Sequence, residues 1–155
     1  SHMESLNLDE IDIKILNALQ NNSEISFETL GKELGVSKST IHYRVMNLKE
    51  RGIIKKFAAI LDPEKLGMGI LAVSLIRAHY NPGYVDYIGD KLKNIPGVWG
   101  VYFLIGEHDF VVLIRAKDKD DLNRIVETFI SMKEIERSNT HVIIKKIKED
   151  IRVDI

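Results

Sequence analysis

Residues 37–44, Ser-Lys-Ser-Thr-Ile-His-Tyr-Arg, combine small hydroxyl side chains with basic and aromatic ones. They follow a short apolar segment, residues 27–34, and a turn that contains Gly35. A helix, a tight turn and a second helix that opens with small polar and basic residues is the pattern of a helix-turn-helix. In that motif the first residues of the second helix face base edges in the major groove. The pattern therefore predicts binding to double-stranded DNA.

The side chains in and after this second helix predict two kinds of DNA contact. Hydroxyl groups in the first turn let a phosphate approach the helix N-terminus, where free N–H groups favour an anion. Arginine pairs most naturally with guanine and asparagine with adenine. The expected phosphate contacts are Lys38, Arg51, Lys55 and Lys56. The candidates for base contacts are Thr40, His42, Tyr43, Arg44 and Asn47, and the predicted DNA-binding set also includes Ser37, Ser39 and Lys49.

Charge is distributed unevenly along the chain, which has 155 residues and a formal net charge of −1. Residues 37–57 hold six lysines and arginines against the single acidic residue Glu50, whereas the segment up to Val36 is mainly acidic. A basic stretch in a near-neutral chain is typical of a phosphate-binding face. The alternative, an ordinary solvated helix face, does not account for the helix-turn-helix spacing.

Composition narrows the function classes further. The absence of cysteine excludes a disulfide framework and thiolate metal sites. The five histidines do not stand at metal-ligand spacing, and there is no phosphate-cradling glycine loop or nucleophile motif. We therefore expect no metal, no cofactor and no catalytic residues. No apolar run reaches the length of a membrane span, and Ser1-His2-Met3 resembles a tag remnant rather than a signal peptide, so we expect a cytoplasmic protein.

Hydrophobic periodicity predicts two domains of an α+β fold. Residues 4–62 form a winged-type helix-turn-helix domain, with helices over residues 8–19, 27–34 and 37–51 and a wing-like exit strand over residues 53–60. Residues 63–155 form a ferredoxin-like domain with the order βαββαβ. Its strands are expected over residues 71–77, 98–105, 110–116 and 138–147, with a first helix after Pro82 and a second opening at Asp118 or Asp120.

Helices in such a domain cover one face of the sheet. The other face would carry Trp99, Val101 or their alternates, and a monomer rarely exposes such an apolar patch. We therefore expect two copies to pack sheet against sheet.

Five blocks of residues, in this order, resemble the Lrp/AsnC family, also called feast/famine regulators. They are Leu8-Asp9…Asp12…Ile15-Leu16…Leu19-Gln20, Leu30…Leu34-Gly35-Val36-Ser37, Arg44-Val45…Leu48…Gly52-Ile53-Ile54, Leu61-Asp62-Pro63…Leu66-Gly67, and Gly106…Asp109-Phe110. The likeness covers essentially the whole chain after Met3.

The resemblance implies a transcription regulator that binds DNA and dimerises through its C-terminal domain, with dimers often assembled into octamers. Many members of the family bind a free amino acid between dimers. The positions that correspond to the effector site are Gly106 and Asp109, and more weakly Ser138 and Thr140.

Two departures from the family pattern concern this site. The loop carries Glu107 and His108 where the family has a small or aromatic residue before the aspartate, and residues 132–137 lack a Pro-Gly-Val turn. Glu107 would favour a basic ligand such as lysine or arginine; alternatively it points to solvent at a hairpin tip.

Two other functions stay open on the sequence. One is a ligand-independent architectural DNA-binding protein, whose binding is dominated by phosphate contacts. The other is an enzyme resembling siroheme decarboxylases on the same fold. Against the enzyme, the Tyr-Asn-Arg-Glu-His run of that branch is absent, since Tyr80-Asn81 is followed by Pro82-Gly83.

Overall fold

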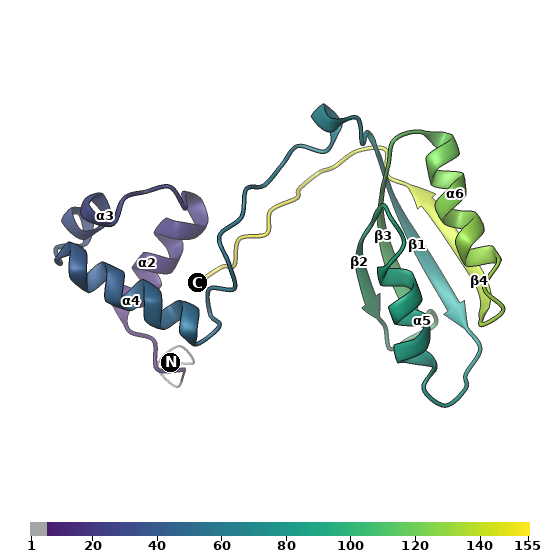
Figure 1. Cartoon of the computed structure of the whole chain (residues 1–155), viewed down its shortest axis with the longest axis horizontal. Helices are drawn as coiled ribbons and strands as arrows, with labels where there is room; N and C mark the ends of the chain where they lie inside the picture. Colours follow the sequence, from purple (N-terminus) through teal and green to yellow (C-terminus); the bar gives the residue numbers. More distant parts are fainter. Residues whose placement is uncertain (1–5) are drawn as a thin grey trace. The chain divides into compact units, whose positions relative to one another are not determined.

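The computed structural model describes residues 6–155 and divides into two compact units (Figure 1). The helix-turn-helix unit contains the chain up to residue 60 together with residues 149–155, and the sheet unit contains residues 61–148. The tag-like residues 1–3 and the start of the predicted first domain at position 4 lie outside the described residues. The domain boundary at 62 stays a prediction.

Three helices build the first unit: α2 (Glu10–Asn21), α3 (Phe27–Leu34) and α4 (Lys38–Glu50). Each begins at a side chain that accepts a backbone N–H, respectively Asp9, Ser26 and Ser37, which satisfies groups that the helix leaves unpaired. Their apolar stripes meet in one core of fully or almost fully buried side chains, formed by Leu8, Ile15, Leu19, Leu30, Ile41, Val45 and Leu48.

The turn between α3 and α4 depends on two glycines. Gly35 ends α3 in the left-handed conformation, with φ of 70°, which glycine adopts without steric cost. Gly31, inside α3, lies so close to the turn that an added Cβ would stand 2.7 Å from the Val36 carbonyl oxygen. The close packing of the turn on α3 therefore requires glycine at position 31.

The predicted exit strand is wrong. Residues 53–60 have no strand in the structure, and Phe57 and Ile60 are exposed. A strand needs a hydrogen-bonded neighbour, and the four-stranded sheet of the described chain includes no residue of this segment. The wing is therefore missing from the described residues, and a 3₁₀ helix, η1 (Glu64–Leu66), precedes the sheet.

The sheet unit has the predicted βαββαβ order, and the α+β fold class is confirmed. Its elements are β1 (Ile70–Ala78), α5 (Tyr84–Lys93), β2 (Val98–Phe103), β3 (Phe110–Ala116), α6 (Lys119–Ile130) and β4 (Ile135–Val142). All neighbouring strands are antiparallel, in the order β2-β3-β1-β4. Helices α5 and α6 pack on one face, where they bury Ile76, Val112 and Phe129 (Figure 1).

Several strand boundaries in this unit differ from the prediction. Strand β2 ends at Phe103 and not at residue 105. Strand β4 starts at Ile135 and ends at Val142, where its pairing with β1 ends opposite Ala72. Helix α5 starts at Tyr84, after Gly83 with a φ of 75°, as expected for a helix that follows Pro82.

The other face of the sheet is only partly covered. Residues paired across the strands share a face, so Leu75 and Val111 lie together on this open face, beside Tyr102. Trp99 is 43% exposed, and its ring stacks under the Arg115 guanidinium at 4.4 Å. Val101, in contrast, is paired with the buried Val112 and packs against the core on the helix-covered face, so the expectation for this residue is wrong.

Candidate functional site

Helix α4 is fixed at its start by a cluster of hydroxyl groups. The Ser37 hydroxyl accepts the Thr40 backbone N–H at 3.1 Å and lies 2.8 Å from the Thr40 hydroxyl and 3.1 Å from that of Ser39. Ser37 and Thr40 therefore hold the first turn of the helix in place.

The outer face of α4 lies opposite its buried stripe of Ile41, Val45 and Leu48. Helical periodicity places Ser39, Tyr43 and Met46 there. Tyr43 is 72% exposed and Met46 43%. Met46 was missed by sequence reasoning, although its position three residues after Tyr43 is a signal that it shares this face.

Arg44, predicted to contact a base, is engaged inside the unit. Its guanidinium donates to the Asp9 carboxylate at 2.5 Å and to that of Asp12 at 3.3 Å. The Arg44 side chain is only 26% exposed and that of Asp12 12%. In this structure Arg44 therefore joins α4 to the start of α2, and its predicted contact with a base stays a prediction.

This ion pair changes the protonation equilibria of its members. The hydrogen bond from Arg44 lowers the pKa of Asp9, and the Asp12 backbone N–H adds to the effect. The Asp9 carboxylate in turn raises the pKa of Arg44. Asp9 and Asp12 also form a reciprocal capping box at the start of α2, so one cluster fixes two helices.

Arg51, predicted to hold a phosphate, also has intramolecular partners. Its guanidinium donates to the Leu6 carbonyl oxygen at 2.6 Å and to that of Asn7 at 3.3 Å. The contact ties the segment before α2 to the end of α4. An open pocket at this junction is lined by Asn7, Asp12, Ser39, Thr40, Tyr43, Arg44, Asn47 and Arg51. Nothing in the sequence had indicated that Asn7 would line a pocket with the residues of α4.

The remaining basic residues of the predicted set are exposed. Lys38, Lys55 and Lys56 have exposed side chains, as does Lys49, whose ammonium lies 4.7 Å from the centre of the Phe57 ring. His42 is exposed, and its ring lies edge-on to the Phe27 ring with 6.0 Å between the ring centroids. Asn47 is half-buried. Exposed lysines on and after α4 therefore remain available to an anionic partner.

In the sheet unit, Asp109 of the predicted effector set is buried and already has partners. Its carboxylate accepts the Ala78 backbone N–H at 2.7 Å, and its own N–H donates to the Ile76 carbonyl oxygen. A hydrogen bond to Asp109 also raises the pKa of the Tyr80 phenol. In the structure Asp109 therefore holds the end of β1.

The other predicted effector residues lie on either side of β1. Gly106 and Glu107 are exposed in the loop between β2 and β3. Ser138 pairs with Ile76 across the sheet, and the Thr140 hydroxyl lies 2.7 Å from that of Ser74. Strand β1 separates the two groups, so they share one sheet but not one cluster of contacts.

An aromatic cluster beside Asp109 was not predicted. The rings of Tyr80, Tyr84, Phe103 and Phe110 form a chain of contacts with centroid separations of 5.2, 6.2 and 5.6 Å. Tyr80 and Phe103 are largely exposed, so the cluster reaches the surface next to the loop.

Within residues 6–155, no group of three or more His, Cys, Asp or Glu side chains is arranged to hold a metal ion. No helix in the same range is long and apolar enough to cross a membrane.

Curated relatives share both units. The HTH-type transcriptional regulator FL11 of Pyrococcus horikoshii is 37% identical over 148 residues, which cover 96% of this chain and 97% of that protein. FL11 of Pyrococcus furiosus is 37% identical over 142 residues, covering 92% and 93%. These relatives are transcription regulators and not enzymes, so they give no support to the decarboxylase-like alternative.

Solved structures agree with the fold. The transcriptional regulator NMB0573 of Neisseria meningitidis, solved in complex with L-Met, matches with a TM-score of 0.90 and 25% identity over 95% of this chain and 96% of that chain. AsnC of E. coli matches with a TM-score of 0.84 and 25% identity, covering 92% and 95%.

Family models match the same two regions. A winged helix-turn-helix DNA-binding model matches residues 8–55, and an Lrp/AsnC ligand-binding domain model matches residues 72–153, more than half of the chain. Together with the relatives at 37% identity, these matches establish that the chain belongs to the Lrp/AsnC family of DNA-binding transcription regulators with a ligand-binding domain.

Proposed function

We propose that this regulator binds a specific DNA site through the outer face of α4 and changes its binding in response to a free amino acid. The observation that carries the DNA part is the division of α4 into two faces. Its inner residues and Arg44 are occupied by contacts within the unit, whereas Ser39, Tyr43 and Met46 face outward. A helix-turn-helix presents this outward face to base edges in the major groove.

The proposed DNA contacts differ in what they contribute. Ser39, His42, Tyr43 and Asn47 are the candidates for reading bases, and Lys38, Lys49, Lys55 and Lys56 for holding phosphates. In a homodimer, two α4 helices would contact half-sites about 34–36 Å apart, one turn of DNA. We propose such a dimer in the cytoplasm, formed through the open face of the sheet, with octamers as a further level of assembly.

We propose that the effector is a basic amino acid bound beside the loop between β2 and β3. Glu107 lies exposed in that loop and supplies a carboxylate for a cationic side chain. Two observations support an amino acid in general: the ligand-binding model matches this region, and the neighbour NMB0573 was solved with L-Met. Asp109 is buried, and its carboxylate already accepts the Ala78 backbone N–H, so in this structure it is not exposed to a ligand ammonium.

The DNA proposal is tested on a site selected from random duplexes. Tyr43→Ala should reduce the preference for the selected site over a scrambled one, measured by fluorescence anisotropy at fixed salt. Changing both Lys55 and Lys56 to alanine should weaken binding to both duplexes and reduce the salt slope by about 0.9 for each lost phosphate contact.

The control for that experiment is Tyr87→Ala, which removes an exposed tyrosine from α5 in the other unit. It should bind like the parent. An unchanged preference in Tyr43→Ala would show that the outer face of α4 does not read the site.

The effector proposal is tested by calorimetric titration with each free amino acid. Lysine or arginine should bind, and Glu107→Gln should weaken that binding about tenfold, as expected for the loss of one charge-assisted contact. Failure of every amino acid to bind would favour the alternative of a ligand-independent architectural DNA-binding protein.

A further inference from the structure

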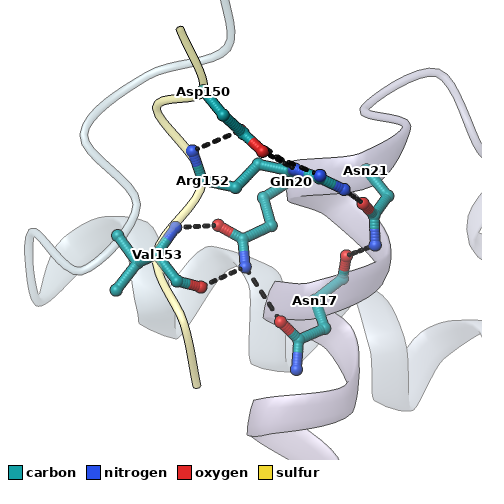
Figure 2. A network of polar contacts seen from close by, with 6 residues as sticks. All are labelled: Asn17, Gln20, Asn21, Asp150, Arg152 and Val153. Atoms are coloured by element: carbon teal, nitrogen blue, oxygen red, sulfur yellow. Dashed lines mark hydrogen bonds and ion pairs between the residues drawn. The ribbon is translucent and has the colours of Figure 1, made fainter. Parts of the chain in front are cut away.

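The end of the described chain lies along the first helix of the helix-turn-helix unit. Figure 2 shows residues 150–153 beside α2, where the Gln20 side chain faces the Val153 main chain. Gln20 Nε2 donates to the Val153 carbonyl oxygen at 2.8 Å, and Gln20 Oε1 accepts the Val153 N–H at 2.9 Å. One side-chain amide therefore pairs with both main-chain groups of a single residue, as a neighbouring strand would.

Two asparagines extend this contact along the helix. Asn17 Nδ2 donates to the Ile155 main-chain oxygen at 3.0 Å, and its Oδ1 accepts from Gln20 Nε2 at 2.8 Å. The Arg152 guanidinium donates to Asn21 Oδ1 and forms an ion pair with Asp150 at 2.8 Å (Figure 2). The segment thus contacts α2 at three side chains.

The three amide residues occupy one face of α2. Asn17, Gln20 and Asn21 stand at spacings of three and four residues, and this face points away from Ile15 and Leu19 in the core. We call Asn17, Gln20 and Asn21 the amide row. Its partners are mainly main-chain groups, whereas the side chains of Ile151 and Val153 are 79% and 65% exposed. The amide row therefore recognises an extended backbone rather than apolar side chains.

We propose that the amide row is a docking site for residues 150–155 of the same chain, which join the helix-turn-helix unit to the sheet unit a second time. The first connection is the segment between α4 and β1, and the second is the segment that follows β4. Because residues 143–149 link the docked segment to β4, its effective concentration at α2 is set by a short linker and not by diffusion.

The docked segment and the recognition helix α4 both form hydrogen bonds with α2. Asp12 of α2 holds Arg44 of α4, and the same helix carries the amide row. Strand β4, which contains Ser138 and Thr140, is joined to the docked segment by residues 143–149. The docked segment therefore contacts the helix that also holds Arg44 of α4.

The absence of cysteine from the chain allows a direct test by cross-linking. The variant carries Glu24→Cys, three residues after Asn21, and Ile151→Cys, within the docked segment; both positions are exposed. The full-length protein is treated with a short bis-maleimide reagent. The expected product is an internally cross-linked monomer, seen by denaturing electrophoresis and by mass spectrometry of the linked peptides that contain positions 24 and 151. Adding Gln20→Ala should slow its formation about tenfold, because two hydrogen bonds of ordinary net strength are lost.

The matched control is Asn123→Ala in the same double-cysteine background, which removes an exposed asparagine from α6 and should leave the rate unchanged. A covalent dimer as the main product would show that the segment docks on a second copy and would overturn the proposal. Equal rates with Gln20 and with alanine at position 20 would also overturn it.

A second measurement does not depend on cross-linking. In the unmodified protein the Val153 amide should be protected from hydrogen exchange, and Gln20→Ala should remove that protection while leaving Ile41 and Val45 amides in α4 protected. Exchange at Val153 as fast as in an unstructured peptide before any mutation would contradict the docking.

Discussion

At the residue scale, Arg44 shows why the type of a side chain does not settle its role. It stands in the recognition helix and has the chemistry to pair with guanine. The structure instead gives it two carboxylate partners from the start of α2, 35 and 32 positions away in sequence. A guanidinium that is three-quarters covered and already paired contributes to the orientation of α4.

Arg44→Ala should therefore destabilise the helix-turn-helix unit by about 1–2 kcal/mol, the range for charge-assisted hydrogen bonds with one half-exposed partner. The pH dependence follows from Asp9, whose pKa is lowered from 3.8 in the folded state. Its contribution is present above that value and is lost as the pH falls through the lowered pKa. Thermal unfolding at pH 7 and pH 3 should show a smaller acid-induced loss in Arg44→Ala than in the parent.

An equal loss of thermal stability between pH 7 and pH 3 in the variant and the parent would show that Arg44 does not stabilise ionised Asp9. Arg44→Lys is the informative comparison, because it keeps the charge but lacks the planar fork that reaches both Asp9 and Asp12.

Gly31 is a second residue whose type the structure explains, because an added side chain would collide with the turn between α3 and α4. A Cβ at this position would stand 2.7 Å from the Val36 carbonyl oxygen, inside contact distance of the backbone. Gly31→Ala should therefore lower the free energy of unfolding by about 1–2 kcal/mol, the cost of overpacking exceeding the gain in helix propensity. Chemical denaturation measures the change.

The control for that change is Gly69→Ala, where an added Cβ meets nothing within 4 Å. It should unfold no more easily than the parent. If both alanine variants were equally stable, the turn would have room that the structure does not show.

At the scale of elements, the helix starts were predictable because they depend on local capping. Ser26 and Ser37, of a residue type that is typical at N-caps, cap α3 and α4. For α6 the sequence left Asp118 and Asp120 open, and the structure decides for Asp118, whose carboxylate accepts the Asp121 N–H at 2.8 Å.

Asp118→Ala should therefore destabilise the sheet unit by about 1 kcal/mol, the usual cost of removing an N-cap. Asp120→Ala is the matched control, since Asp120 lies in the first turn and contributes only through the helix dipole. The measurement is the midpoint of thermal unfolding. A larger decrease of the unfolding midpoint in Asp120→Ala than in Asp118→Ala would show that Asp120, and not Asp118, is the cap.

Strand ends were less predictable than helix starts. The alternating residues around positions 53–60 resemble a strand, yet none forms there among the described residues. Strand β4 pairs only with β1, and this pairing ends at Val142 opposite Ala72 although β1 itself begins at Ile70. The extent of a strand depends on pairing with residues elsewhere in the chain, which the local sequence does not display.

At the scale of the whole molecule, the open face of the sheet is the main apolar surface of its unit. It carries Leu75 and Val111 beside Trp99 and Tyr102. Soluble monomers rarely leave such a face uncovered. This observation supports sheet-on-sheet pairing of two copies, and the residue positions make the pairing testable.

Val111→Asp should prevent the proposed sheet-on-sheet dimer and leave a monomer, because pairing would bury an unpaired carboxylate against its equivalent face. Sedimentation velocity at a fixed protein concentration gives the oligomeric state. Trp99, the single tryptophan, should shift its emission to longer wavelength as its surroundings become exposed. Asn123→Asp on α6 adds the same charge away from this face and should remain dimeric; a dimer in Val111→Asp would exclude the open face as the interface.

The sequence by itself determined the α+β class, the βαββαβ order of the second unit and the position of the helix-turn-helix. These features depend on periodicity and capping within a few residues, which the sequence displays directly. Only the tertiary structure decided that Arg44 and Arg51 bind inside the unit, that Asp109 is buried with Ala78, and that Gln20 holds Val153 across 133 positions. Such contacts join atoms that are distant in the chain, and their partners follow from the packing of the folded units.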